Sequence, residues 1–235
     1  MVRRAYDHIV SEEFGGSPYS QEQTIQLLLD IKSDELFSFC ALTYLTAARC
    51  CEILPYHARH YVKRVKRDIN GKSIKVDGKY EWIKIPNLDN DLPGARKLDV
   101  HFEIKNGFDY MKMSIRNEKN RQTKHKTPST PIYFERDLIP RLKSWLSTKS
   151  DDEELFPYCE RSMLRRLKKE QPKLFYLHFL RALRATHLFT VYGLEERMVV
   201  KYMGLTDGRA LKNYLMFVTK DLEEAMIKAV KNNIG

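Results

Sequence analysis

Residues 46–54 place a charged pair in a segment that is otherwise apolar. The segment reads TAARCCEIL, and Arg49 stands three residues before Glu52. A buried guanidinium is costly unless it is paired with an acid. By itself the segment therefore indicates an arginine–glutamate pair that serves structure, although a guanidinium fork is also well suited to a phosphate.

A second segment, residues 178–188, reads HFLRALRATHL. His178 and Arg181 are three residues apart and would share one face of a helix. Arg184 and His187 continue the basic character along the same segment. Taken singly, each residue is interpreted more simply as part of a solvated basic face or as a histidine satisfied within the core.

A third segment, residues 203–214, reads MGLTDGRALKNY. A glycine-bearing turn leads into a short helix that presents Tyr214. One tyrosine taken alone is more often a packing residue than a nucleophile. The order and spacing of the three segments, considered together, indicate chemistry that none of them indicates separately.

In this order the segments resemble the tyrosine recombinase (integrase) family. The family motif T-G-x-R-x-x-E fits Thr46–Glu52, and the segment LFPYCERSMLRRL, upstream of His178, is also similar to the family. In the family's L-G-H motif the nucleophilic tyrosine comes nine residues after the histidine, which matches the interval from Leu205 to Tyr214. The resemblance covers about residues 18–232. The motif H-x-L-R-H-x-x-A-T-x-L is matched by His178, Leu180, Arg181, Ala185, Thr186 and Leu188.

The resemblance implies site-specific cleavage and rejoining of DNA through a 3′-phosphotyrosine at Tyr214. Arg49 and Arg181 would bind the non-bridging oxygens of the scissile phosphate, and His178 would donate a further hydrogen bond or help to deprotonate the tyrosine. Glu52 would orient this site. A tyrosine with an ordinary pKa near about 10 needs such cationic neighbours to attack at neutral pH. Neither a metal nor another cofactor is implied.

The family also carries a catalytic lysine in a β-hairpin, which would protonate the leaving 5′-oxygen. The segment SIRNEKNRQTKHKTPSTPIYF fits this hairpin. Lys119 matches the end of the incoming strand, where the family usually places the lysine, and is preferred. Lys124 matches better when the count runs back from Pro131, so it stays as the alternative.

Three departures from the family pattern stand out. Leu205 occupies the position that is usually His or Trp, so it can buttress the tyrosine helix but cannot donate a hydrogen bond to the phosphate; Thr206 could substitute. Ala182 replaces the second histidine of the H-x-L-R-H motif. We expect residues 1–17 to form only a short N-terminal arm, which is too short for the extra DNA-clamping domain that many members carry.

The elements that would position these residues indicate an α+β, mainly α fold, with a small antiparallel sheet between the first and the later helices. Ser20 and Gln23 are spaced as in a capping box, and the helix over 34–54 should break near Thr46. The runs SIKV, YEWIKI, LDVHFEI, YMKMSIR and STPIYF are expected strands, separated by turn signals at 70–71, 77–78 and 106–107. Expected helices cover residues 20–32, 34–54, 136–147, 160–170, 177–192, 194–203, 208–217 and 219–232.

In domain terms, we expect the catalytic domain to span residues 18–218. The C-terminal helix, 219–235 with its amphipathic part at 219–232, would either pack on its own domain or be exchanged between protomers. Exchange is slightly preferred, since the resemblance implies a homotetramer assembled on double-stranded DNA.

A net charge of +10 is compatible with nucleic-acid binding, although charge alone also fits a solvated basic surface. Four cysteines in 235 residues do not suggest a disulfide framework, and no signal peptide or membrane segment is evident, so we expect a cytoplasmic protein that acts on nucleoid or mobile-element DNA. The basic side chains that we expect to contact DNA are Lys63, Arg64, Lys66, Arg67, Arg121, Lys124, Arg165 and Arg184.

Three other interpretations compete with a recombinase. A type IB topoisomerase-like enzyme would share the chemistry and relax DNA as a monomer. A DNA-binding homologue that has lost catalysis would explain Leu205. A zinc site built from Cys50, Cys51, His57 and His60 is disfavoured, because adjacent cysteines on a helix point apart and the spacing is unusual for zinc.

Overall fold

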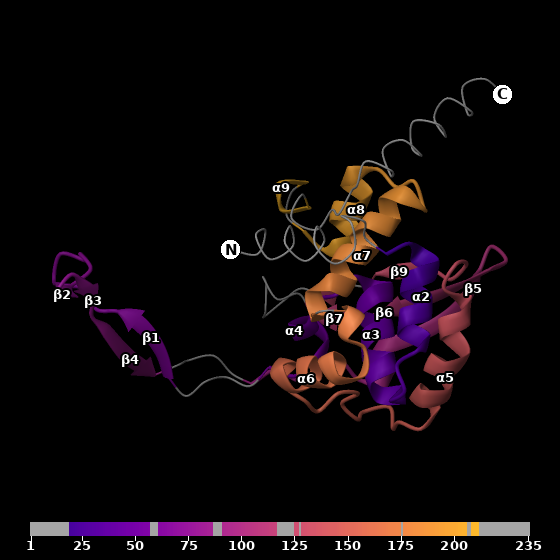
Figure 1. Ribbon diagram of the computed structural model, residues 1–235, viewed down its shortest axis with the longest axis horizontal. Helices are drawn as coiled ribbons and strands as arrows, with labels where there is room; N and C mark the ends of the chain where they lie inside the picture. The colour runs from indigo at the N-terminus through magenta and orange to yellow at the C-terminus, as the bar shows by residue number, and fades with distance from the viewer. Residues whose placement is uncertain are drawn as a thin grey trace, which may run out of the picture.

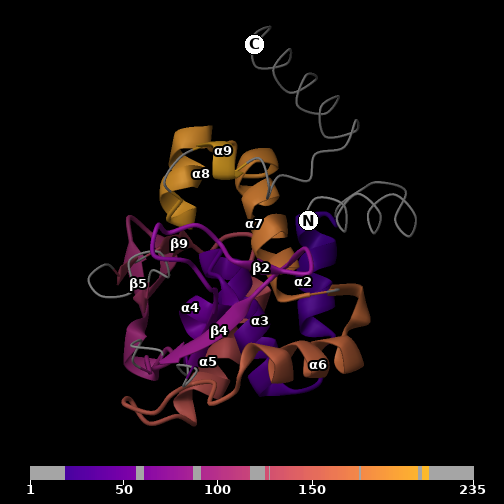
Figure 2. The ribbon, with the colours of Figure 1, turned by 90° about the vertical axis from the view of Figure 1, so that its left-hand side faces the viewer.

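A computed structural model describes residues 19–56, 61–86, 91–116, 125–126, 128–174, 176–205 and 208–211. At its centre lies α3 (Asp34–Thr46), in which every residue from Leu36 to Thr46 is buried. A helix that is apolar on all sides is stable only when other elements surround it. Figures 1 and 2 show α2, α5 and α7 arranged around α3.

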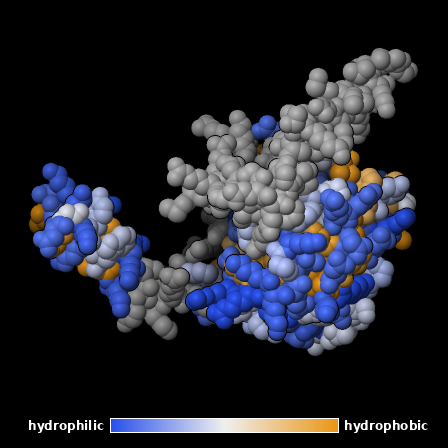
Figure 3. All heavy atoms as spheres, in the orientation of Figure 1, coloured by the Kyte–Doolittle hydropathy of each residue, from blue (hydrophilic) through white to orange (hydrophobic). Residues whose placement is uncertain are grey.

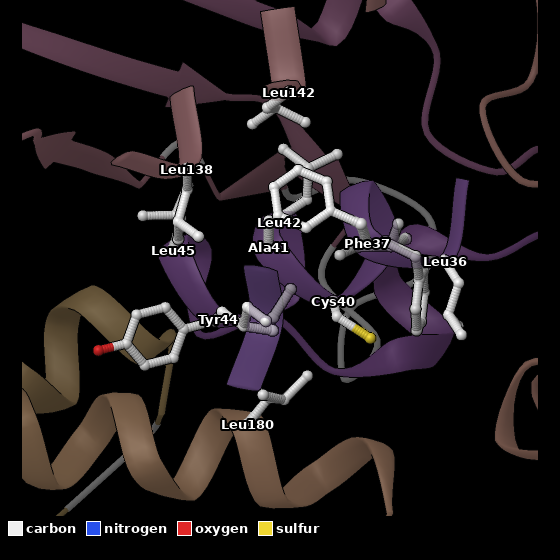
Figure 4. Packing of buried hydrophobic residues seen from close by; sticks show 14 of the residues in the cluster. Leu36, Phe37, Cys40, Ala41, Leu42, Tyr44, Leu45, Leu138, Leu142 and Leu180 are labelled. Carbon is white, nitrogen blue, oxygen red and sulfur yellow. The ribbon is translucent and has the colours of Figure 1, made fainter. Parts of the chain in front are cut away.

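The main core forms where these helices meet. Leu138 and Leu142, from the turn and helix that follow the sheet region, cover one side of α3, and Leu180 of α7 covers another (Figure 4). The helices are α2 (Gln21–Leu29), α3, α4 (Cys50–Ile53), α5 (Ile139–Ser147), α6 (Glu160–Glu170), α7 (Leu177–Thr190), α8 (Glu196–Met203) and α9 (Gly208–Leu211), with 3-10 turns at Lys97–Asp99, Arg136–Leu138 and Pro172–Leu174.

The local signals at the helix ends are confirmed. Ser20 accepts from the backbone N–H of Gln23, and the Gln23 side chain accepts from the backbone of Ser20, which is the expected capping box. The break expected near Thr46 is present, because α3 ends there and α4 begins at Cys50. The expected helix 136–147 starts with a 3-10 turn before α5.

The strands form four small antiparallel sheets. They comprise β1 (Tyr61–Val65), β2 (Lys75–Val76), β3 (Lys79–Tyr80), β4 (Trp82–Pro86), β5 (Val100–Lys105), β6 (Phe108–Met113), β7 (Ile115–Arg116), β8 (His125–Lys126) and β9 (Ser129–Pro131), paired as β1–β4, β2–β3, β5–β6–β9 and β7–β8. Two of the expected turns are tight hairpins: Asp77 and Gly78 have φ of 51° and 75°, and Asn106 and Gly107 have φ of 53° and 80°. Positive φ at both positions fits a type I′ turn.

The expected antiparallel β region between the first and the later helices is confirmed, but it forms several small sheets instead of one, because two of the expected strands divide. YEWIKI divides at Glu81, whose N–H donates to Ile74 while its carbonyl accepts from Lys66, so the chain changes pairing partner there. YMKMSIR divides at Ser114, whose N–H still donates to the carbonyl of Asp99 just before β5, whereas the next residue, Ile115, pairs with Lys126 of β8. The strand β1 was not expected, because YVKRV lacks a clean alternation of apolar and polar residues.

Residues 61–86 form a hairpin that stands apart from the helices in Figure 1. The sheet β1–β4 forms its base and β2–β3 lies at its far end. None of the helices in the described ranges is long and apolar enough to cross a membrane. The expected arm at 1–17, the expected helix at 219–232 and the second half of 208–217 lie outside the described residues.

Candidate active site

Arg49 lies at a junction between two helices. Ala47, the C-cap of α3, has φ 49° and ψ 32°, a left-handed conformation that an alanine seldom adopts, and Arg49 is the extended N-cap of α4. The expectation that Arg49 sits inside a helix was therefore wrong. Its side chain is almost fully buried, and Glu52 accepts both from its backbone N–H at 2.8 Å and from its Nη1 at 3.0 Å.

Arg181 joins the same junction from α7. It is fully buried, its Nη1 donates to the carbonyl of Ala47, and its Nη2 donates to the carbonyl of Met203 at 2.9 Å. Those carbonyls lie at the ends of α3 and α8, where helices carry unsatisfied acceptors and partial negative charge. Arg181 Nη1 is also 3.8 Å from Glu52 Oε2. Two arginines that are far apart in the sequence thus converge on one carboxylate.

His178 lies one turn before Arg181, at the start of α7, and is half-buried. Its Nδ1 is 3.9 Å from the Sγ of Cys50, the residue that follows Arg49. The histidine therefore faces the junction that holds the two arginines. A hydrogen bond with the Cys51 thiol, burial and the Glu160 carboxylate raise the pKa of the Cys50 thiol well above its usual range.

A small apolar cluster lies next to this junction, separate from the main core. Leu205 is buried within it, and its N–H donates to the carbonyl of Val200 at 3.0 Å. Leu205 is therefore a packing residue in the described structure, and its expected part in buttressing the tyrosine helix stays a prediction. The members of the cluster are Ala47, Ala185, Leu188, Val199, Met203, Leu205 and Leu211.

Arg184 occupies a buried position and not the exposed basic face from which it was expected to contact DNA. It is fully buried and forms an ion pair with the buried Glu135. The Tyr192 hydroxyl donates to the same carboxylate at 2.7 Å and Gln21 Nε2 donates to it at 2.5 Å. The buried ion pair with Glu135 leaves the Arg184 guanidinium no surface for DNA in the described structure, which argues against the predicted DNA contact. Glu135 could not be predicted as the partner of Arg184, because no spacing pattern in the sequence marks it.

His187 is likewise structural. Its Nε2 lies 2.9 Å from the carbonyl of Tyr19 and its Nδ1 lies 2.7 Å from the hydroxyl of Tyr44. A carbonyl only accepts, so Nε2 carries the proton and Nδ1 accepts from Tyr44. Burial lowers the pKa of His187 to about 4. This is the satisfied core histidine that the sequence analysis held as the simpler alternative.

Some of the remaining predicted site residues lie within the described part of the chain and others do not. Lys63, Arg64, Arg67 and Arg165 are exposed, whereas Lys66 is half-buried. On α6 the exposed residues Arg161, Arg165 and Lys168 recur at helical spacing and so form one basic face. Several predicted positions lie outside the described residues, among them the predicted nucleophile and both candidate lysines. They are Tyr214, Lys119, Lys124, Arg121, Thr206, His57 and His60.

Solved structures share this arrangement of elements. A XerA recombinase matches with a TM-score of 0.52 at 14% identity, over 91% of this chain and 64% of the other. A XerH site-specific recombinase in a post-cleavage complex with palindromic difH substrate matches with a TM-score of 0.50 at 15% identity, over 90% of this chain and 52% of the other.

The fold is that of the tyrosine recombinases. The chain spans about half of the length of the XerH chain and 64% of the XerA chain. No family model and no curated protein matches the sequence. At sequence identities of 14–15%, the structural likeness establishes the tyrosine recombinase fold alone. What this chain does chemically depends on its own site residues.

Proposed function

We propose that this chain is the catalytic part of a site-specific tyrosine recombinase of integrase type, which cleaves and rejoins double-stranded DNA through a 3′-phosphotyrosine. The observation that carries the proposal is the convergence of Arg49 and Arg181 on Glu52, with His178 on the same side of α7. Such a pair of guanidinium groups has the charge and fork geometry that a phosphodiester requires.

In the proposed reaction, Tyr214 attacks the scissile phosphorus in line. The bond from its phenolic oxygen to phosphorus forms, the bond from phosphorus to the 5′-oxygen breaks, and the tyrosine proton passes to His178. Arg49 and Arg181 stabilise the charge that develops on the non-bridging oxygens. Lys119, or alternatively Lys124, gives its proton to the departing 5′-oxygen. Because the phosphotyrosine conserves the bond energy, religation needs neither ATP nor a metal cofactor.

Access to the phosphate requires a local change. Arg181 has no exposed surface, and its guanidinium binds the carbonyls that end α3 and α8. The phosphate can therefore reach Arg181 only when one of these ends moves and its carbonyl bond is exchanged for a phosphate oxygen. We propose that DNA binding and assembly on DNA drive this movement, which keeps the free protein inactive.

The hairpin over residues 61–86 supports DNA as the partner. It carries eight Lys or Arg residues and three Asp or Glu residues, a formal charge of +5. Lys63 and Lys84 lie directly opposite each other on β1 and β4, and both are exposed. Like charges across a strand pair destabilise a sheet unless an anion lies between them. The exposed Trp82 shares that face, and Figure 3 shows the largely hydrophilic surface of the hairpin.

Covalent capture tests the proposal. The protein is incubated in EDTA with nicked duplexes from a randomised pool, and adducts that survive denaturant are isolated. We expect an adduct that Tyr214→Phe abolishes and that the exposed control Tyr133→Phe retains. An adduct that persists in Tyr214→Phe would show that another residue is the nucleophile.

The competing functions give different outcomes in the same assay. If the protein binds duplex DNA but the pool yields no adduct, the catalytically inactive homologue replaces the proposal. Captured sequences then allow the products to be compared: strand exchange between two sites supports a recombinase, whereas relaxation of supercoiled DNA alone supports a topoisomerase.

We further propose that the protein forms a homotetramer on DNA. If residues 219–232 are exchanged between protomers, truncation after residue 218 would prevent this assembly.

A further inference from the structure

Three potential metal ligands meet beside the proposed active site. Among the described residues, the Sγ of Cys50, a carboxylate oxygen of Glu160 and a ring nitrogen of His178 all lie within 4.8 Å of one another. We infer that Cys50, Glu160 and His178 bind a zinc ion, and that this ion holds His178 away from the scissile phosphate. Zinc binding stands independently, whereas the inhibition rests on the proposed function.

The geometry is close to that of a tetrahedral site. Zn–S and Zn–N bonds of about 2.3 and 2.05 Å place sulfur and nitrogen ligands about 3.6 Å apart. Cys50 Sγ and His178 Nδ1 are 3.9 Å apart. Glu160 is exposed and is the first residue of α6, so its side chain can rotate to complete the set. With water in the fourth position, these three side chains suffice.

The ligand types select the metal. A thiolate and an imidazole favour zinc over magnesium or calcium, which prefer oxygen ligands. The Cys50 thiolate and the Glu160 carboxylate would together balance the charge of the ion, which matters next to Arg49 and Arg181. Cys50 is almost fully buried while Glu160 is exposed, so the ion would enter from the α6 side.

This set differs from the zinc site considered in the sequence analysis. Of that earlier set only Cys50 takes part, and its partners come from α6 and α7, which are distant in the sequence.

A zinc ion at this site would block the part that His178 takes in the proposed reaction. A His178 nitrogen bound to zinc can neither donate to the phosphate nor accept the tyrosine proton, so the ion would act as an inhibitor.

Cobalt spectroscopy tests the binding. Reduced protein, first stripped with chelator, is titrated with Co²⁺, and Zn²⁺ is then added as competitor. We expect one Co²⁺ per chain, with thiolate charge-transfer absorption and the visible bands of tetrahedral cobalt, both removed by Zn²⁺. Cys50→Ser should abolish the charge-transfer band, and Glu160→Gln should weaken binding by about 10-fold or more. The exposed control Cys159→Ser should leave the spectrum unchanged.

Two spectroscopic results would overturn the site: a cobalt spectrum that survives in Cys50→Ser, or one that depends on Cys159 instead. Glu160→Gln alters an exposed side chain, so its effect does not depend on folding. In the adduct assay, Zn²⁺ should inhibit the unmodified protein at a concentration that leaves Glu160→Gln active. Equal adduct formation with and without bound zinc would refute inhibition. If EDTA-treated protein forms no adduct at all, the proposed function fails while the cobalt spectrum still decides the metal site.

Discussion

At the scale of single residues, Glu52 determines whether the arginine pair can exist. Its carboxylate accepts from the backbone and the side chain of Arg49 and lies 3.8 Å from Arg181. Both guanidinium groups are withdrawn from water, so their charges depend on this acid and on the carbonyls around it. The same arrangement keeps two cations side by side at the junction, where the proposed reaction would use them.

Glu52→Gln should therefore destabilise the whole domain. The amide keeps the shape but removes the charge, and we expect the free energy of unfolding to fall by about 3 kcal/mol. Chemical denaturation of both proteins measures the loss. The control Glu153→Gln removes the exposed carboxylate of an ion pair with Lys149 at the surface and should cost much less. Equal losses in the two variants would contradict the role of Glu52.

His187 gives the stability of the protein a dependence on pH. Its pKa is about 4 in the folded protein because of burial, against about 6.5 in an unfolded chain. As the pH falls, the unfolded chain takes up the proton first. The contribution of a neutral His187 is therefore complete above about pH 6.5 and is lost progressively towards pH 4.

The unfolding free energy should then fall by about 1.4 kcal/mol per pH unit between these limits because of this one residue. His187→Gln should flatten the dependence by that amount, whatever it does to stability at pH 7.5. Denaturation at several pH values from 7 to 4.5 gives the slope. The exposed His101→Gln should keep the original slope, and an unchanged slope in His187→Gln would show that the pKa is not depressed.

At the scale of elements, the helices bury their apolar side chains, whereas the hairpin over residues 61–86 exposes several of its own. The helices are held by a common core, so their ends and faces are constrained by many partners. The hairpin over residues 61–86 exposes Trp82, Tyr80, Val76 and Ile69 instead of burying them. Exposed apolar side chains interleaved with cations are suited to a nucleic-acid duplex, where cations meet phosphates and an indole can pack against sugars or bases.

Removal of the opposed lysines should weaken DNA binding electrostatically. For Lys63→Gln with Lys84→Gln, we expect a lower affinity and a slope of log affinity against log salt reduced by about 2, one unit for each lost phosphate contact. Binding to duplex DNA at a series of salt concentrations measures both. Lys32→Gln with Lys105→Gln removes the same charge from exposed positions elsewhere and should leave the slope nearly unchanged.

At the scale of the whole molecule, one buried polar network links the first described helix to the candidate site. Glu135 binds Gln21 of α2, Arg184 of α7 and Tyr192 beyond α7. The ring of Tyr44, from the central helix, lies against the Arg184 guanidinium. Since α7 also carries His178 and Arg181, the network fixes the helix on which the proposed chemistry depends.

A double-mutant cycle should reveal this coupling. Glu135→Gln and Arg184→Met each leave a buried group without its counter-charge, and each should cost about 3 kcal/mol. The double variant should cost at least about 1 kcal/mol less than the sum, because it leaves no single charge behind. Denaturation curves of the four proteins provide the cycle, and strict additivity would mean that the pair is not coupled.

Where the variants stay folded, Arg165→Met should lower DNA affinity and Arg184→Met should not.

The sequence by itself determined the local features of this protein. The capping box at Ser20, the break after Thr46 and the hairpin turns at 77–78 and 106–107 depend on backbone preferences within a few residues, so they could be predicted from the residues concerned. The order of helices and strands followed in the same way, and with it the mainly α fold.

Only the tertiary structure decided which charges are buried. Arg165 and Arg184 both occur in basic helical segments, yet one is exposed and the other is enclosed with Glu135. Their different environments depend on which helix faces meet, and those contacts join residues that are far apart in the chain. The same non-local packing places Arg49 and Arg181 around Glu52, as the order of the motifs had indicated. It also places Cys50 and Glu160 beside His178, a grouping that no spacing in the sequence predicted.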